Sequence, residues 1–127
     1  MRVLLDTNVL LRTLAGDPAV ESIRDILLAD ETEVYVSAVS WWDIAARIEA
    51  GRLKADLAEL REASAASGFI ELPLRGEHIG ALAGLAASGA KAPSFDLVLA
   101  AQAEVEPLRL ISSDTRFAVR SSLFLRV

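Results

Sequence analysis

The sequence predicts an α/β fold: a three-layer α/β/α sandwich with a mostly parallel central sheet. Short apolar runs alternate along the 127 residues with longer stretches rich in alanine and leucine, which favour helices. Strands separated by helices indicate βαβ units, whose crossovers make neighbouring strands parallel and place helices on both faces of the sheet. The length suits one domain with its own core, so we predict a single domain over residues 1–127.

Five segments have the character of strands, because each is short, largely apolar and bounded by turn-forming or helix-starting residues. They are Arg2–Leu5, Glu33–Ser37, Phe69–Leu72, Arg109–Ser112 and Leu123–Arg126. The first strand stops abruptly at Asp6. Because the carboxyl ends of parallel strands share one edge of a sheet, Asp6 is expected at the edge where open α/β folds bind ligands.

The helical segments are bounded by residues that begin or end helices. Asp17 and Pro18 open one of them, and Gly51 and Gly68 each stop another. The predicted helices are Asn8–Leu14, Asp17–Ala29, Ser40–Ala50, Asp56–Ser67, Glu77–Ala87, Ser94–Glu104 and a short turn at Thr115–Val119. The strongly apolar stretch Leu97–Ala103 is expected to be buried against the sheet.

Three large side chains carry further expectations. Trp41 and Trp42 are adjacent on a predicted helix, where neighbouring side chains diverge by ~100°, so we expect one in the core and one partly exposed. An exposed tryptophan there would suit a protein interface. His78 follows the start of a helix and is expected at the surface.

Composition excludes several kinds of chemistry. The chain has no cysteine and one histidine, which rules out disulfides and leaves no basis for a thiolate or histidine zinc site or a histidine-based triad. No apolar run approaches the ~18 residues of a membrane span, and Asp6 interrupts the first apolar run too early for a signal peptide. We therefore expect a cytoplasmic protein whose chemistry depends on carboxylates, hydroxyls, amides and basic groups.

The charge of the chain is unusual for a protein that binds nucleic acid. The net charge is −5 and the isoelectric point is near 4.8, whereas nucleic-acid-binding domains are usually basic. Carboxylates clustered in a metal site would account for part of this charge, because bound cations neutralise them. A basic partner protein would also balance the surface.

Four aspartates are predicted to meet at the carboxyl edge of the sheet. Asp6 and Asp114 directly follow strands, whereas Asp43 and Asp96 are expected in the first turns of helices. Carboxylates close together raise each other's pKa values, and a bound cation resolves this repulsion. With only oxygen ligands available, Mg²⁺ or Mn²⁺ is the natural choice. Such an ion activates water and orients phosphate, which indicates phosphodiester hydrolysis.

Each aspartate also has a purely structural interpretation. Ser40 and Asp43 have the spacing of a capping box, and Ser94 can cap the helix that carries Asp96. Asp114 can be a turn residue, and Asp6 can form an Asx turn. The coincidence of four such positions at one edge favours the functional interpretation.

Four sequence blocks resemble PIN-domain proteins, above all the VapC-type ribonuclease toxins of bacterial toxin–antitoxin pairs. The blocks are Leu4–Leu11, Ser37–Arg47, Phe95–Ala103 and Leu110–Phe117. The resemblance implies the PIN fold, with a five-stranded sheet of order 3-2-1-4-5. It also implies Mg²⁺- or Mn²⁺-dependent endonuclease activity on tRNA or other structured RNA, a homodimer, and inhibition by a cognate antitoxin whose tail covers the site.

The same resemblance implies roles for individual residues. Asp6, Asp96 and Asp114 match metal-site positions, and Asp43 takes the place of an acidic residue, usually glutamate, that holds a metal or positions water. The polar positions that support this site are matched by Asn8 and the Ser112 hydroxyl; local cap or turn bonds are the alternative for both.

Basic side chains near the acidic blocks are candidates for contacts with RNA phosphate, since lysine and arginine supply most of that affinity. Lys91 and Arg116 flank the acidic blocks, and Arg12 lies in the first helix. The alternative is that these long side chains only cover solvent-facing surfaces.

The chain departs from the family pattern at three points. Asp43 replaces the longer glutamate, Lys91–Asp96 lacks the first aspartate of an Asp-Pro-Phe-Asp block, and Leu97 stands where relatives often carry arginine. These departures motivate a second hypothesis, a catalytically weakened PIN domain that binds RNA or protein. A third, a phosphate-transfer or receiver domain, is disfavoured because no second carboxylate accompanies Asp6.

Overall fold

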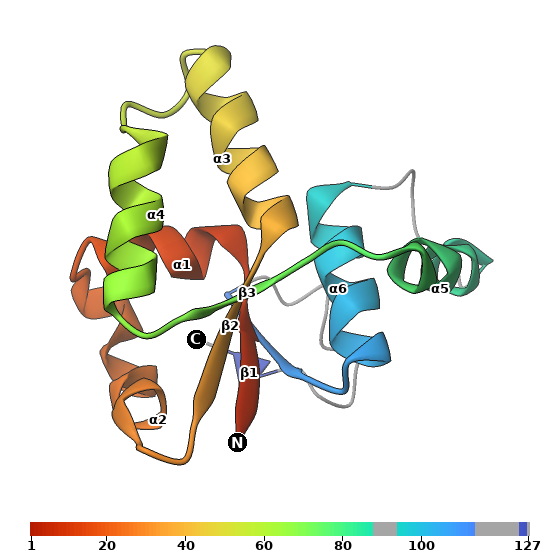
Figure 1. Cartoon of the computed structure of the whole chain (residues 1–127), viewed down its shortest axis with the longest axis horizontal. Coiled ribbons are helices and arrows are strands. Elements are labelled where there is room, and N and C mark those ends of the chain that lie inside the picture. The colour runs from red at the N-terminus through yellow and green to blue at the C-terminus, as the bar shows by residue number, and fades with distance from the viewer. Residues whose placement is uncertain (88–93, 114–124, 127) are drawn as a thin grey trace.

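The structure is a computed structural model that describes residues 1–87, 94–113 and 125–126 (Figure 1). Its sheet has the order β3-β2-β1-β4-β5, and every pairing is parallel. The strands are β1 (Arg2–Leu5), β2 (Glu33–Ser37), β3 (Ile70–Leu72), β4 (Arg109–Ser112) and β5 (Leu125–Arg126). The predicted fold class and strand order are therefore confirmed.

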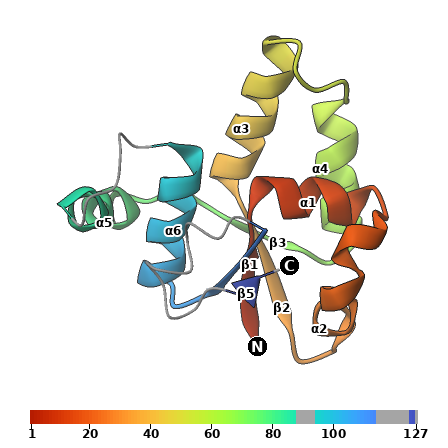
Figure 2. The same cartoon turned by 180° about the vertical axis from the view of Figure 1, so that it is seen from behind.

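Helices cover both faces of this sheet. They are α1 (Thr7–Leu14), the 3₁₀ helix η1 (Pro18–Ile23), α2 (Arg24–Leu28), α3 (Ala38–Glu49), α4 (Leu57–Ala66), α5 (Gly76–Ala87) and α6 (Phe95–Val105). Figures 1 and 2 show α1, α2 and α4 on one side of the sheet and α5 and α6 on the other. The hairpin of α3 and α4 rises beyond the carboxyl ends of the strands.

Strand β1 divides two hydrophobic cores because its side chains alternate between the sheet faces. Leu4 points into the core with α5 and α6, whereas Val3 and Leu5 point into the core with α1, α3 and η1. All three side chains are fully buried. Burial on both faces explains why the strand is continuously apolar, as is typical of parallel sheets.

Most helix bounds agree with prediction within one or two residues, and α6 is buried from Val98 to Ala103 as expected. The segment predicted as one helix from Asp17 instead forms η1 followed by the short α2. Within these two elements only Ile23 is buried, so little packing enforces one regular helix. The predicted turn Thr115–Val119 lies outside the described residues. Within the described ranges, no helix is long and apolar enough to cross a membrane.

Candidate active site at the carboxyl edge of the sheet

Asp6 joins β1 to α1 and is held on several sides. Its side chain caps α1 by accepting a hydrogen bond from the Val9 N–H at 2.8 Å, and its own N–H donates to the Ile111 carbonyl at 3.1 Å. The Ser112 hydroxyl donates to the other carboxylate oxygen. Asp6 is only 3% exposed. The structural interpretation of Asp6 was an Asx turn; the bond observed is instead a helix-capping bond to Val9, and it fixes the carboxylate at the edge between β1 and β4.

Asp43 does not lie in the first turn of its helix, so that expectation is wrong. Helix α3 begins at Ala38, with the Ser37 side chain as its N-cap accepting from the Val39 N–H. The first turn consequently contains no acidic residue. Ser40 forms no capping box with Asp43; its buried hydroxyl accepts a hydrogen bond from Thr7 instead.

A three-residue contact links α3 to α1 at this edge. Arg47 donates from Nε to Asp43 Oδ1 at 2.9 Å and from Nη2 to Asp43 Oδ2 at 3.0 Å. Its third nitrogen, Nη1, donates to Asn8 Oδ1 at 2.8 Å. The Asp43 side chain is 7% exposed and that of Arg47 25%, so the carboxylate lies inside and the guanidinium toward solvent.

Asp96 lies in the first turn of α6, as predicted, and is partly buried. Ser94 occupies the N-cap position, but its side chain makes no capping bond, so the capping interpretation for this helix is not borne out. The N-terminal end of α6 packs against α3 through Phe95, whose ring lies edge-on to that of Trp42 with the ring centroids 4.8 Å apart. Asp43 directly follows Trp42 in the sequence and Asp96 directly follows Phe95, so each aspartate adjoins one of the two aromatic residues in contact.

The tryptophan pair behaves as expected. Trp41 is 8% exposed and belongs to the core, whereas Trp42 is 60% exposed. The supporting residues and the RNA-contact candidate Arg12 differ in their contacts. Asn8 and Ser112 both bind site side chains, whereas Arg12 lies at the end of α1 and is partly buried.

Three predicted site residues, Asp114, Lys91 and Arg116, lie outside the described residues. Among residues 1–87, 94–113 and 125–126, no group of three or more acidic or histidine side chains is close enough to hold a metal ion. The donors present, Asp6 and Asp96, offer only oxygen, which fits Mg²⁺ or Mn²⁺. A complete site would require Asp114, and the convergence of all four aspartates stays a prediction.

Sequence reasoning missed a buried polar chain on the other side of the sheet. His78, expected at the surface, is fully buried. Its Nδ1 accepts from the Arg75 N–H at 2.9 Å, which leaves Nε2 to donate to Glu106 at 2.6 Å. Gln102 accepts from the Ser37 hydroxyl and donates to the Pro73 carbonyl at 3.3 Å. A glutamine inside the apolar run of α6 was the available signal.

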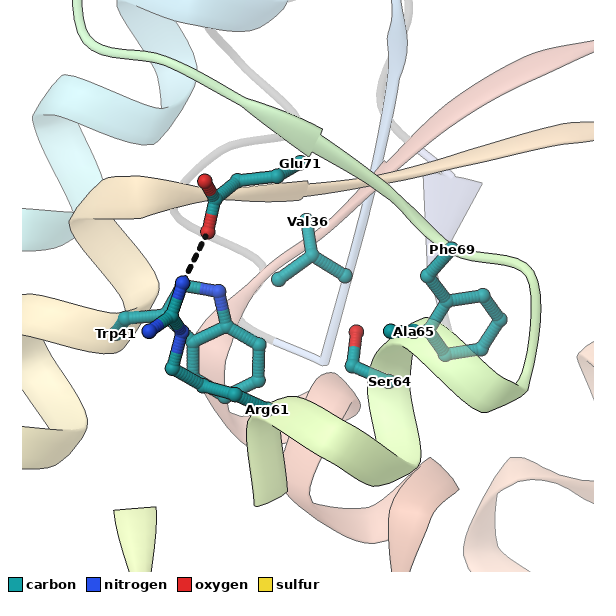
Figure 3. Close-up of a pocket in the computed structure, with 7 residues that line it drawn as sticks. All are labelled: Val36, Trp41, Arg61, Ser64, Ala65, Phe69 and Glu71. Carbon is teal, nitrogen blue, oxygen red and sulfur yellow. Dashed lines mark ion pairs between the residues drawn. The ribbon is translucent and has the colours of Figure 1, made fainter. Parts of the chain in front are cut away.

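A pocket of about 190 Å³ lies between the α3–α4 hairpin and the edge of the sheet (Figure 3). It is lined by Val36, Trp41, Arg61, Ser64, Ala65, Phe69 and Glu71. Arg61 and Glu71 form an ion pair of 3.5 Å at this pocket. None of the predicted site residues lines it, so this pocket is not the predicted site.

Comparison with known proteins identifies the family of this α/β fold. Residues 3–122 match the family model described as the PIN domain. The chain therefore belongs to the PIN-domain family. A search of curated proteins gave no match.

Solved structures share this fold over nearly their whole length. One is VapBC2 from Rickettsia felis bound to a DNA fragment from its promoter (15% identity, TM-score 0.72, covering 100% of this chain and 98% of that chain). Others are VapBC-1 from nontypeable Haemophilus influenzae (16%, 0.68, 100% and 97%) and FitAcB from Neisseria gonorrhoeae (24%, 0.59, 91% and 88%).

Proposed function

We propose that this protein is a metal-dependent endoribonuclease and the toxin of a toxin–antitoxin pair. PIN-domain toxins of this kind are typically nucleases, and PIN domains typically use a divalent metal. The observation that carries the proposal is Asp6, a buried carboxylate at the carboxyl end of the central strand, oriented by Val9 and Ser112. A strand end with a fixed carboxylate is where an α/β fold would hold a cation for catalysis.

In this proposal Asp6, Asp96 and Asp114 hold a Mg²⁺ or Mn²⁺ ion. The bound ion would lower the pKa of water and help to orient the scissile phosphate. The protein's own part is orientation. The Val9 N–H and the Ser112 hydroxyl each fix one oxygen of Asp6, so the carboxylate need not reorganise when the cation arrives. Mutual repulsion of the carboxylates makes the cation a requirement for a fully ionised site.

Partners and place of action are part of the same proposal. Similar structures are described as toxin–antitoxin complexes, some of them bound to DNA. For this chain we propose a cognate antitoxin, a homodimer, and tRNA or another structured RNA as substrate in the cytoplasm. The net charge of −5 suits an antitoxin with a basic segment.

One observation favours the alternative, a catalytically weakened PIN domain that binds RNA or protein. Both oxygens of Asp43 are engaged by Arg47, although this position is usually a glutamate that serves the metal or the water. An assay of RNA cleavage distinguishes the two functions. Cleavage of RNA with Mn²⁺ that is lost in Asp6→Asn would exclude the weakened form.

Calorimetric titration with Mn²⁺ tests the proposed metal site. We expect the wild type to bind, and Asp6→Asn and Asp96→Asn to lose binding. Asp25→Asn is the matched control, because Asp25 is an exposed first-turn aspartate of α2 and should leave binding unchanged. A folded wild type that neither binds Mn²⁺ nor cleaves RNA would refute the nuclease proposal.

A further inference from the structure

We propose that Arg47 binds a phosphate of the RNA, and that Asp43 is the positioning residue of Arg47 rather than a ligand of the metal. This inference rests on the proposed ribonuclease function and assigns two side chains within it. It follows from the way in which Asp43, Arg47 and Asn8 share their hydrogen bonds at the carboxyl edge of the sheet.

The first step concerns the orientation of the guanidinium. Arginine has five N–H donors, and in Arg47 one donor on each nitrogen is used, toward Asp43 and Asn8. One hydrogen therefore remains on each terminal nitrogen. Because α3 and α1 both hold the group, its plane is fixed before any substrate arrives, and little side-chain entropy is left to lose on binding.

The second step concerns Asp43. Its two oxygens accept a bidentate pair of charged hydrogen bonds, and the carboxylate is almost fully buried behind the guanidinium. A cation ligated by either oxygen would lie beside the positive charge of Arg47, and like charges at that distance repel. Asp43 therefore serves the arginine and not a metal.

The third step concerns the ligand. A planar guanidinium with a hydrogen on each terminal nitrogen matches the oxygens of a phosphodiester better than a lysine would. Asn8 lies two positions after Asp6, in the first turn of α1, so the guanidinium that it anchors is held near the proposed metal edge. On a chain of net charge −5, a fixed cation at this edge would counter the repulsion of an anionic strand.

The test measures the affinity of a fluorescently labelled 20-nucleotide RNA by anisotropy, with Ca²⁺ as the divalent ion. We expect Arg47→Met and Asp43→Asn each to weaken binding about tenfold. The double variant should bind no more weakly than Arg47→Met, because Asp43 acts through Arg47. Arg47→Lys, which keeps the charge without the planar fork, should give an intermediate loss and guards against a folding defect.

The Asp43→Asn result separates this proposal from general electrostatics. Removing a negative charge from an acidic protein should strengthen RNA binding if only the overall field matters, whereas we expect it to weaken. Arg24→Met is the matched control for the arginine. Arg24 also pairs with a glutamate, at 3.6 Å, but it lies on α2 near the amino ends of the strands (Figure 1).

A second arm titrates the same variants with Mn²⁺. We expect Arg47→Met and Asp43→Asn to keep the wild-type affinity within about threefold, whereas Asp6→Asn loses it. Loss of Mn²⁺ binding in Asp43→Asn as complete as in Asp6→Asn would overturn the inference, as would equal RNA affinities for Arg47→Met and Arg24→Met. A folded wild type that neither binds Mn²⁺ nor cleaves RNA would instead refute the nuclease proposal, so the two failures are distinguishable.

Discussion

Two hydrogen-bonded polar clusters lie on opposite sides of the sheet, and they differ in the number of charged side chains that they contain. The edge cluster consists of Asp6, Asn8, Asp43, Arg47 and Ser112. The inner network consists of Ser37, Gln102, His78 and Glu106. Both are well bonded, so burial with hydrogen bonds does not by itself mark a functional site. The edge cluster contains more carboxylates than cations, whereas the inner network is built mainly from neutral side chains.

We interpret the inner network as stabilising the fold and the edge cluster as the candidate functional site. In the inner network each donor meets an acceptor of the same chain: the Arg75 N–H meets His78, and the Ser37 hydroxyl meets Gln102. Such a network links α5, α6 and β2, and its hydrogen bonds are satisfied without a ligand. In the edge cluster Asp43 is paired with Arg47, whereas Asp6 accepts hydrogen bonds from the Val9 N–H and the Ser112 hydroxyl. Under the proposed function, Asp6 is a carboxylate that would bind the cation.

The largest expected effect is that of Asp6→Asn. We expect Mn²⁺ affinity to fall by more than about 100-fold, because removing a ligand should exceed the loss caused by removing an outer-shell partner. The amide oxygen can still accept from Val9, so the fold should be kept. Calorimetry gives the affinity and urea unfolding gives the stability. A large loss of stability would instead identify Asp6 as a structural residue.

His78→Ala should break the inner network and leave the edge cluster intact. We expect the free energy of unfolding to fall by about 3 kcal/mol, because the change leaves a cavity and unpaired groups at Arg75 and Glu106. Urea unfolding measures the loss, and Mn²⁺ titration of the folded variant should give the wild-type affinity. Unchanged stability would contradict a structural role for this network.

Ser112→Ala sharpens the comparison within the edge cluster. The variant removes the hydroxyl that donates to Asp6 and should lower Mn²⁺ affinity by about 10-fold, the lower end of the range for groups that orient a ligand. Its effect on the free energy of unfolding should be about 1 kcal/mol. An affinity equal to that of the wild type would show that Ser112 forms only a local bond.

The smallest effect is expected from Asp56→Ala, which changes an aspartate in neither cluster. Asp56 caps α4 by accepting from the Glu59 N–H at 3.1 Å. Losing this cap should cost about 1 kcal/mol of stability and nothing in metal or RNA affinity. Thermal unfolding and the two titrations check this expectation. Weaker Mn²⁺ binding here would mean that stability alone limits the site, and the contrast between the clusters would fail.

The sequence predicted the parts of the molecule that local pattern determines. The parallel sheet and the proximity of the ends of β1 and β4 could be anticipated, because carboxyl ends of neighbouring parallel strands meet. The full strand order came only from the resemblance to the PIN family. The start of α3 could not, since Ser37 and Ser40 are both suitable caps and tertiary contacts decide between them. Likewise, one buried histidine cannot be separated from an exposed one without knowing where Glu106 lies.

The pairing of Asp43 with Arg47 was within reach of the sequence, because residues four apart on a helix are neighbours. Asn8 as the third member of this contact could not be predicted, since it depends on how α1 and α3 pack. Local spacing thus indicates pairs, whereas a site that joins several elements depends on the whole fold.

The central place of β1 has a consequence for how long the site persists. Val3, Leu4 and Leu5 are buried in two cores at once, and the strand is bonded to β2 and β4 along its length. Segments of this kind open only when the whole domain unfolds, so their amide hydrogens exchange slowest. Asp6 directly follows Leu5, the last residue of this strand. Its carboxylate should therefore keep its position through the local openings that loosen the exposed helices, and be lost only with the fold itself.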